Sequence, residues 1–523
     1  MIKLRLLQLV FFFNTVVFAQ LPLRPDSTFN TDGIYQQDFG FQDNLTAVTV
    51  QPLDNKIIAV GTAINQTTFG GKLLVLRLLS DGTPDLTFNT TGSVVIEAYN
   101  ESYAYAVQVL PTGKILVAGT VANEQFQFSA CAMLFNSDGT LATEFGTNGI
   151  FLSASAPGDE FAYSMAIQAD GKIVLAGSAG DDQFRAMPAI WRLNADGTPD
   201  LSFGNNGATF MTVENSDNDF SSVLLESNGA IVASGHYDQG ITSGGQQNFD
   251  FLTARFLSNG TPDVVFGGDG YVESPISFEY SEEAYGMLIA EDGNIVVSGY
   301  TLAGDLSYDF ALLKFRNDGT LDASFGNNGV VVQNFGSGDV IYDMALQNGK
   351  FLCAGTSGSG FDDLDFTMIR FNPNGSLDTD FGDNGTLRTD IAAGFDEANG
   401  LTIQQDGRIV LAGKGNNGVQ NDAVVVRYTD QINDVGVEQL DNSSIQLFPN
   451  PAMRGTSLNL LGLQTSVDAI QLLDLQGRMV DGFQLSQVSN GIELEIPSNI
   501  SQGLYILQIV SQNKIQHFNV AVK

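Results

Sequence analysis

The chain offers few residue types that could carry out catalysis. Its 523 residues include only two histidines, His236 and His517, and two cysteines, Cys131 and Cys353. A nucleophilic serine or cysteine needs a convergent base, and zinc, haem and iron–sulfur sites need several His or Cys ligands. The sequence contains no G-x-S-x-G, H-E-x-x-H, C-x-x-C or P-loop pattern. We therefore assign no catalytic, cofactor-binding or metal-ligating residue.

Carboxylates are the one abundant reactive group, with 59 Asp and Glu. The densest acidic loops are residues 217–220, 278–286 and 361–366. A glycosidase needs two carboxyl groups at a defined separation, which these loops could supply, but we favour the interpretation that they are solvated surface loops. Asp- and Gly-rich turns could also hold calcium, although no D-x-D-x-D-G loop is present. No cofactor is predicted, and calcium is the single alternative.

Two motifs recur along the chain and define the elements that would position these groups. Successive copies of each motif are between 56 and 64 residues apart. The turn motif "NADGTPDLSFGNNG" (194–207) has its Phe at Phe29, Phe88, Phe145, Phe203, Phe266, Phe325 and Phe381. The motif "ADGKIVLAG" (169–177) ends at Gly61, Gly119, Gly177, Gly235, Gly299, Gly355 and Gly413. Both markers give seven copies, which indicates a repeat architecture.

Each repeat contains a series of short β-strands. Residues 163–168 alternate in polarity, an Asp-Gly turn follows, and "KIVLAG" and "PAIWRL" are rich in apolar residues. Asp-Gly and Asn-Gly between apolar runs are hairpin signals. No stretch shows helical periodicity, and four strands in each repeat are typical of β-propeller blades.

The phase of the repeat predicts a closed ring. Residues 25–40 match the end of a repeat, whereas residues 422–430 form a third strand without a fourth. The N-terminal strand would therefore complete the seventh blade, and closure would hide the sheet edges. We predict an all-β chain whose residues 23–430 form a seven-bladed β-propeller closed by an N-terminal strand.

A pair of charged positions accompanies the turn motif. A position four residues before the turn is Arg or Lys in six of seven repeats, and a position three residues before the Phe is Asp in six. The exceptions, Leu134 and Ala142, fall in the same repeat. We hypothesise one cation–Asp pair in each blade, with Arg427 pairing to Asp26 across the closure, and the Phe filling the seam between blades.

His236 follows Gly235, where it interrupts a column of mostly hydroxyl residues. We interpret it as a tolerated surface residue, with a catalytic role as the alternative. The equivalent residues in the other repeats are Thr62, Thr120, Ser178, Tyr300, Thr356 and Lys414. Cys131 and Cys353 lie in apolar strands of different repeats, and we expect both to be buried free thiols.

The N-terminus has the layout of a secretory signal peptide. Lys3 and Arg5 precede an apolar run, and "VFA" predicts cleavage between Ala19 and Gln20, so residues 1–19 would be removed. A membrane anchor is the alternative, but the uninterrupted apolar run is shorter than the ~20 residues of a span. We expect a soluble mature protein without a membrane span. Its net charge of −36 argues against nucleic-acid binding.

After a linker at residues 431–444 the repeat pattern stops. Residues 445–523 alternate in polarity over six or seven short segments, which predicts a small Ig-like β-sandwich. The motifs "FPNP" (448–451), "LLDLQGR" (472–478), "GLYILQIV" (503–510) and the terminal "VAVK" resemble the type A C-terminal sorting domain of the type IX secretion system. This resemblance implies export through the periplasm and across the outer membrane, with the type IX machinery as partner. It also implies that the protein is released or attached to the surface.

The repeats themselves resemble the delta-60 repeat family, through "DGTLDASFGNNG" and "DGKIVLAG". That family brings no established catalytic residues. We expect a monomeric, secreted or cell-surface propeller that acts as a binding module for a glycan or protein or as a structural component. The alternative is an extracellular polysaccharide hydrolase that uses paired channel carboxylates.

Overall fold

A computed structural model gives the fold, and contacts divide it into two compact units, Met1–Asp430 and Gln431–Lys523. Each unit is described by itself. The predicted signal peptide with its Ala19–Gln20 cleavage site and the predicted linker, residues 431–444, lie outside the described residues. The structure describes residues 23–40, 42–64, 70–183, 185–212, 217–241, 247–277, 280–304, 306–360, 363–391, 394–429, 446–448, 452–461, 469–473, 480, 484–488, 491–511 and 514–523.

The first unit consists of antiparallel β-blades that follow one another along the chain, and a single parallel pair, Asn421 opposite Gln42, also links the last blade to the first. Blade 1 contains β3 (Gln42–Val50), β4 (Ile57–Ile64), β5 (Gly71–Leu78) and β6 (Ser93–Val95). Blade 2 contains β7 (Glu101–Val109), β8 (Ile115–Ala122), β9 (Phe128–Phe135) and β10 (Ile150–Leu152). Blade 3 contains β11 (Glu160–Ile167), β12 (Ile173–Gly180), β13 (Ala186–Leu193) and β14 (Ala208–Phe210). Blade 4 contains β15 (Ser222–Leu225), β16 (Ile231–Ile241), β17 (Gln247–Phe256) and β18 (Tyr271–Ser274).

The remaining blades repeat this order. Blade 5 contains β19 (Glu282–Ile289), β20 (Ile295–Leu302), β21 (Tyr308–Phe315) and β22 (Val330–Gln333). Blade 6 contains β23 (Val340–Gln347), β24 (Lys350–Gly360), β25 (Asp363–Phe371) and β26 (Thr386–Thr389). Blade 7 contains β27 (Glu397–Ile403), β28 (Ile409–Asn416) and β29 (Asn421–Thr429) from the end of the repeats.

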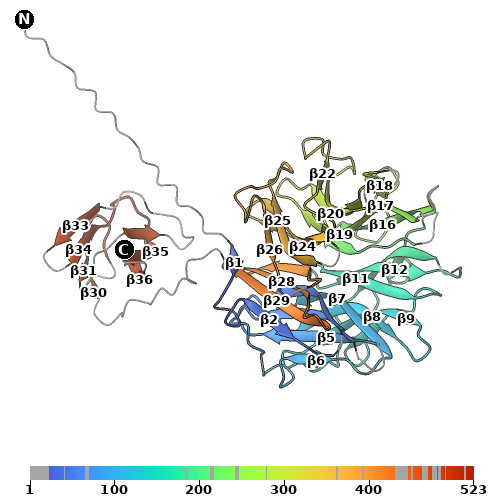
Figure 1. The fold of residues 1–523 in the computed structure, drawn as a ribbon. Coiled ribbons are helices and arrows are strands. Elements are labelled where there is room, and N and C mark those ends of the chain that lie inside the picture. Colours follow the sequence, from blue (N-terminus) through green and yellow to red (C-terminus); the bar gives the residue numbers. More distant parts are fainter. Residues whose placement is uncertain are drawn as a thin grey trace, which may run out of the picture. The chain divides into compact units, whose positions relative to one another are not determined.

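The N-terminus completes blade 7, as predicted. Strand β2 (Ile34–Gln37) pairs antiparallel with β29, with Ile34 opposite Val426, and β1 (Arg24–Pro25) extends the same edge. In Figure 1 the blue β2 lies beside the orange β29. The first strands of neighbouring blades contact one another, and β27 contacts β3, so the ring closes around an axis lined by these strands. The prediction of a seven-bladed propeller closed by an N-terminal strand is confirmed.

A β-bulge shapes the first strand of a blade and explains the Gly marker. The register of β11 against β12 shifts between Ala162 and Ser164, so Tyr163 is the extra residue. Opposite this bulge, a Cβ atom added to Gly177 would lie 1.9 Å from the carbonyl oxygen of Phe161. Only glycine tolerates so close an approach of two backbones. The same register shift occurs in the first strands of blades 1, 2, 5, 6 and 7.

The recurring Phe fills the seam between blades. Phe203 is fully buried, and the backbone N–H of the next residue, Gly204, donates to Asn259 O in the turn of the following blade. Gly260 of that turn packs so closely that an added Cβ would lie 2.8 Å from the Phe203 ring. Equivalent hydrogen bonds join six successive pairs of turns, the first from Asn30 to Asp81. The interpretation of the turn motif as a seam element is confirmed.

The hypothesised cation–Asp pairs form in all six repeats that carry both residues. Each cation also lies 4.5 to 5.8 Å from the centroid of the Phe ring of its own motif. The pairs are Arg77–Asp85 (2.8 Å), Arg192–Asp200 (2.7 Å), Arg255–Asp263 (2.8 Å), Lys314–Asp322 (3.7 Å), Arg370–Asp378 (2.7 Å) and Arg427–Asp26 (2.8 Å). In blade 2 the buried, uncharged Leu134 and Ala142 replace the pair, so neither charge is left alone.

The described residues of the second unit form seven strands in two sheets. One sheet has the order β30 (Gln446–Phe448), β31 (Ser457–Leu461), β34 (Gly491–Glu495), β33 (Gln484–Val488). The other has the order β32 (Ala469–Leu473), β35 (Gly503–Ser511), β36 (Lys514–Val522). Leu458 and Leu494 from the first sheet share a core with Leu472 and Leu507 from the second. The two small sheets therefore pack face to face, as the alternating pattern indicated.

Candidate functional site

Tyrosines from four blades line the central channel. Tyr105, Tyr163, Tyr285 and Tyr342 occupy the bulge position of the first strands of blades 2, 3, 5 and 6. All four line one cavity of about 550 Å³ on the axis. A bulge re-aims its extra side chain, so the backbone irregularity directs these rings into the channel. Blades 1 and 7 place the smaller Thr46 and Asn399 in this position, lining the same cavity.

The first strands all run in the same direction, because each is followed by the same hairpin. Their beginnings therefore share one mouth of the channel, which we call the upper mouth. We call the bulge positions of the first strands the tyrosine column. Two residues before this column, blades 4, 5 and 7 carry the carboxylates Asp219, Glu283 and Glu397. Glu283 accepts hydrogen bonds from the hydroxyls of Tyr285 (2.6 Å) and Tyr300 (2.8 Å).

The hydrogen-bonded groups continue across blades 5, 6 and 7. The Tyr285 and Tyr342 ring centroids are 5.3 Å apart, and the Tyr342 hydroxyl donates to Glu397 Oε2 (3.4 Å). Lys414 Nζ lies 3.4 Å from the same Glu397 oxygen. Hydroxyl and ammonium donors therefore hold the two glutamates in fixed positions, and a ligand at this mouth would meet hydrogen-bonding groups on a rigid ring.

His236 belongs to the upper mouth. Its Nδ1 lies 3.2 Å from Asp219 Oδ1, its ring centroid is 4.7 Å from that of Phe249, and its side chain is only 20% exposed. Burial lowers the pKa of His236, but the Asp219 carboxylate outweighs burial and raises the pKa to about 9. His236 is therefore a partly exposed partner in an ion pair, at a position where five of the other six repeats carry a hydroxyl residue.

Blades 2 and 3 contribute an aromatic ladder to the same side of the channel. The rings of Phe128 and Phe161 stack with centroids 5.3 Å apart, and those of Phe161 and Tyr163 with centroids 6.0 Å apart. Tyr105 meets Tyr163 edge to face at 5.2 Å. All four side chains are half-buried. The upper mouth thus combines aromatic surfaces on one side with carboxylates and hydroxyls on the other.

The channel environment keeps its tyrosines neutral. Burial raises the pKa of Tyr105 to about 12, and burial together with the Glu283 charge raises the pKa of Tyr285 further. These hydroxyls therefore act as hydrogen-bond donors at any physiological pH. Lower in the channel, burial raises the pKa of Asp343 to about 6, although its carboxylate accepts the backbone N–H of Leu401 (2.8 Å).

The three acidic loops predicted from the sequence lie in different parts of the propeller. Loop 217–220 brings Asp219 to the upper mouth, and loop 278–286, whose residues 278 and 279 lie outside the described residues, brings Glu283 there. In the third loop residues 361 and 362 lie outside the described residues, but Asp365, Asp390 and Asp396 gather with ligand atoms within 4.8 Å. Both oxygens of the fully buried Asp396 accept backbone N–H groups, which leaves little capacity for a calcium ion. We assign no metal site there.

The two cysteines do not line the channel cavity. Cys131 and Cys353 are free, buried thiols, as expected, and burial raises the pKa of Cys131 to about 12. Neither is poised for reaction, because the thiolate is the reactive form. His517 lies in β36 of the second unit.

Sequence reasoning missed the tyrosine column, although a signal for it exists. Counting 14 residues back from the marker Gly gives Tyr105, Tyr163 and Tyr285, and counting 13 residues back from Gly355 gives Tyr342, so four of seven repeats carry a tyrosine there. The bulge that this Gly faces is visible only in the strand register. Asp219, Glu283 and Glu397 converge for the same reason: they occupy the same position of the first strand in three blades, and ring closure places that position at one mouth of the channel.

This geometry defines a closed seven-bladed propeller with a non-repeated, aromatic and acidic channel mouth. A family model described as "Domain of unknown function (DUF5122) beta-propeller" matches residues 53–88, 168–203, 290–325, 346–381 and 404–429. A second, described as "Secretion system C-terminal sorting domain", matches residues 446–523. The chain therefore carries DUF5122 propeller repeats, which are those of the delta-60 repeat family, and a type IX sorting domain. The sorting domain indicates secretion to the cell surface or extracellular space through the type IX machinery.

Comparison with solved structures gives distant matches. Drosophila Semaphorin 2a matches at 9% identity and a TM-score of 0.45, over 96% of this chain and 99% of that chain. A protein of unknown function from Dyadobacter fermentans DSM 18053 matches at 13% identity and a TM-score of 0.38, over 76% and 99%. No functional argument rests on similarities this low. No curated protein matches the chain. Among the described residues, no helix has the length and apolar character of a membrane span.

Proposed function

We propose that this chain is an extracellular binding propeller that holds a glycan at the upper mouth of its channel. The observation that carries the proposal is the pairing of the Phe128–Phe161–Tyr163 ladder with fixed carboxylate and hydroxyl groups around one opening. An aromatic face suits the apolar side of a sugar ring, and the polar groups suit its hydroxyls. A few oriented polar groups in an aromatic cavity are the usual composition of a ligand site.

The proposal includes a route to the surface. Residues 1–19 would be removed between Ala19 and Gln20, residues 23–430 would act as the ligand-binding propeller, and residues 445–523 would be read by the secretion machinery after a linker at 431–444. We propose that the mature protein acts as a monomer.

A glycan array probed with the chain lacking residues 1–19 tests the function. We expect binding to a restricted set of glycans, and we expect Phe161→Ala or Tyr163→Ala to weaken it at least about 10-fold, since a stacked aromatic side chain contributes more than ~1 kcal/mol. Leu201→Ala is the control, because Leu201 is 71% exposed on a turn at the other end of the blades. Binding that is absent, or that survives both aromatic substitutions, would remove the proposal.

Hydrolysis is the second candidate, because Glu283 and Glu397 share one mouth through the Tyr285–Tyr342 contact. Paired carboxyl groups are the requirement for glycosidic cleavage. Incubation with glycans found on the array, followed by reducing-end measurement, separates the two functions. Cleavage that Glu283→Gln and Glu397→Gln both abolish would establish a hydrolase, whereas unchanged glycans would leave a binding module.

A further inference from the structure

Six blades carry the Asp of the cation–Asp pair. In five of them a second donor side chain also contacts the carboxylate of this Asp. It comes from the residue that begins the second strand or directly precedes it. In blade 3, Lys172 Nζ lies 3.0 Å from Asp200 Oδ2, the same oxygen that Arg192 contacts. The equivalent contacts elsewhere are Lys56–Asp85 (3.1 Å), Asn294–Asp322 (3.3 Å), Lys350–Asp378 (2.8 Å) and Arg408–Asp26 (2.9 Å).

Blade 4 breaks this rule. Ala230 occupies the position of Lys172, and its methyl group cannot reach Asp263. A second change accompanies the first, because blade 4 has Glu226 where blades 3 and 7 have Gln168 and Gln404. Glu226 lies 3.9 Å from the Arg255 guanidinium, which Asp263 also contacts.

Both changes make the local charge of blade 4 more negative. In blade 6, Arg370 and Lys350 face a single carboxylate, Asp378, with the neutral Gln347 bonded to Arg370 (2.7 Å). These groups sum to +1. In blade 4 the single cation Arg255 faces two carboxylates, which sum to −1. Blade 4 therefore lacks the positive charge that Lys56, Lys172, Lys350 and Arg408 supply at this place in four other blades.

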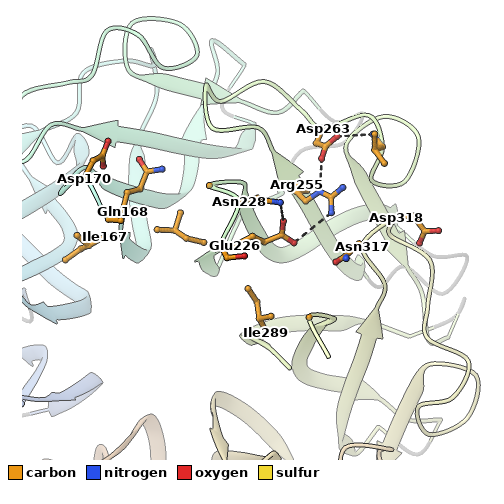
Figure 2. Close-up of a pocket in the computed structure, with 16 residues that line it drawn as sticks. Ile167, Gln168, Asp170, Glu226, Asn228, Arg255, Asp263, Ile289, Asn317 and Asp318 are labelled. Atoms are coloured by element: carbon orange, nitrogen blue, oxygen red, sulfur yellow. Dashed lines mark hydrogen bonds and ion pairs between the residues drawn. The ribbon is translucent and has the colours of Figure 1, made fainter. Parts of the chain in front are cut away.

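The residues around the missing cation line a cleft of about 1110 Å³, formed by blades 3, 4 and 5. Figure 2 shows Arg255 between Asp263 and Glu226, with Asn228 Nδ2 donating to Glu226 Oε2 (3.1 Å). Arg255 is only 7% exposed, so its charge is partly withdrawn from solvent. Ile167, Leu225 and Ile289, which end three first strands, form the floor nearest the axis.

We propose that this cleft binds an alkylammonium group, which takes the place of the lysine that blade 4 lacks. The ammonium would lie against Glu226 and Asp263, and the apolar ends of the first strands would contact its alkyl chain. The strongly acidic chain attracts such cations at long range. The cleft is at the end of the channel opposite the upper mouth, so this inference is independent of the glycan proposal.

Isothermal titration calorimetry tests the site with two probes that share this chemistry, 1,5-diaminopentane and a short peptide with one internal lysine. We expect one binding event on the full chain, and the tighter probe identifies a free diamine or a protein side chain as the source. Ala230→Lys supplies the repeat's own cation, and Glu226→Gln removes the extra carboxylate. Each should weaken binding at least about 10-fold, as expected when one partner of a close charge pair is lost or occupied.

Ala230→Lys follows the repeat consensus, so it should fold, and an unchanged or higher melting temperature confirms that lost binding is local. Lys350→Ala in blade 6 is the matched control and should leave the affinity unchanged. 1-Pentanol, which keeps the chain but not the charge, should not bind. The proposal fails if the unmodified chain binds neither amine, or if Ala230→Lys binds them as tightly as the unmodified chain.

Discussion

Arg427 and Asp26 form an ion pair across 401 positions of sequence. Arg427 Nε donates to Asp26 Oδ2 at 2.8 Å, both side chains are at most 5% exposed, and the guanidinium lies 4.9 Å from the Phe29 ring centroid. Burial raises the pKa of Asp26, but hydrogen bonds from Thr28 and the Arg427 charge outweigh it and lower the pKa below its usual value. The pair that stabilises a turn within other blades here joins the two ends of the repeat array.

Asp26→Asn tests what this pair contributes to closure. It leaves the buried Arg427 without its counterion, and we expect the free energy of unfolding to fall by about 3 kcal/mol. Denaturant titration measures the change. Asp200→Asn is the control, since it breaks the same kind of pair inside a continuous stretch of chain. Only Asp26→Asn should also increase amide hydrogen exchange in residues 34–37, and equal exchange in both variants would show that the pair has no special role in closure.

A double-mutant cycle on Arg192 and Asp200 measures the pair itself. Both side chains are less than 10% exposed, and Arg192 Nε lies 2.8 Å from Asp200 Oδ2. We expect each single substitution to alanine to be costly and the double variant to recover part of the loss, with a coupling energy of about 1 to 3 kcal/mol. Strictly additive effects would contradict the assignment of this contact as a stabilising ion pair.

Asp43 gives the fold a predictable pH dependence. It is fully buried, and burial raises its pKa from 3.8 to about 7, with Asp38 and Asp422 adding to the shift against the hydrogen bond from Phe39 N. The folded state therefore holds a proton that the unfolded state releases, and this contribution to stability is complete below pH 3.8 and is lost as the pH rises to about 7.

Asp43→Asn stays neutral and keeps an oxygen that can accept the Phe39 N–H. We expect the variant to gain stability relative to the unmodified chain as the pH rises from about 4 to 7, by at least about 1 kcal/mol. Melting temperatures of both proteins at each pH provide the comparison. A difference that is constant over this range, or that changes in the opposite direction, would refute the buried-acid assignment.

Removal of residues 440–523 should separate export from folding. The two units make compact cores of their own, so the propeller should fold without the second unit. Because the sorting domain is the export signal, we expect the shortened protein to accumulate in the periplasm with an unchanged melting transition. Immunoblots of periplasm and medium measure its location. Its arrival in the medium in normal amounts would contradict a role of this domain in secretion.

The sequence predicts the architecture closely because the repeated motifs mark each blade and the closure of the ring. The Phe and Gly markers recur in all seven repeats and the charged pair in six, because each corresponds to a contact that is made again in successive blades. The phase shift corresponds to a single contact, the pairing of the N-terminal strand with blade 7. The channel site is harder to predict, because Tyr163, Glu283 and His236 each occupy a different position of the repeat, and the residue type at each of these positions varies from blade to blade. Their convergence depends on the strand bulges and on ring closure, which bring residues more than 100 positions apart to one mouth.

Ala230 is a residue whose importance the sequence alone does not reveal. In the sequence it looks like a minor deviation from a Lys-rich column. Only the contacts of Lys172 with Asp200 show that the column supplies a charge, and therefore that blade 4 lacks one.

The pairing of β2 with β29 is the central claim, and a disulfide tests it directly. Ile34 and Val426 are directly opposite, and Cα atoms of such pairs lie about 4.5 to 5.5 Å apart, which suits a disulfide. Mass spectrometry of the oxidised Ile34→Cys/Val426→Cys variant should therefore show a link between the two introduced cysteines. The Ile34→Cys/Val424→Cys variant, displaced by two residues, should remain reduced. Failure of the first pair to link, or equal linking of both pairs, would contradict the closed ring.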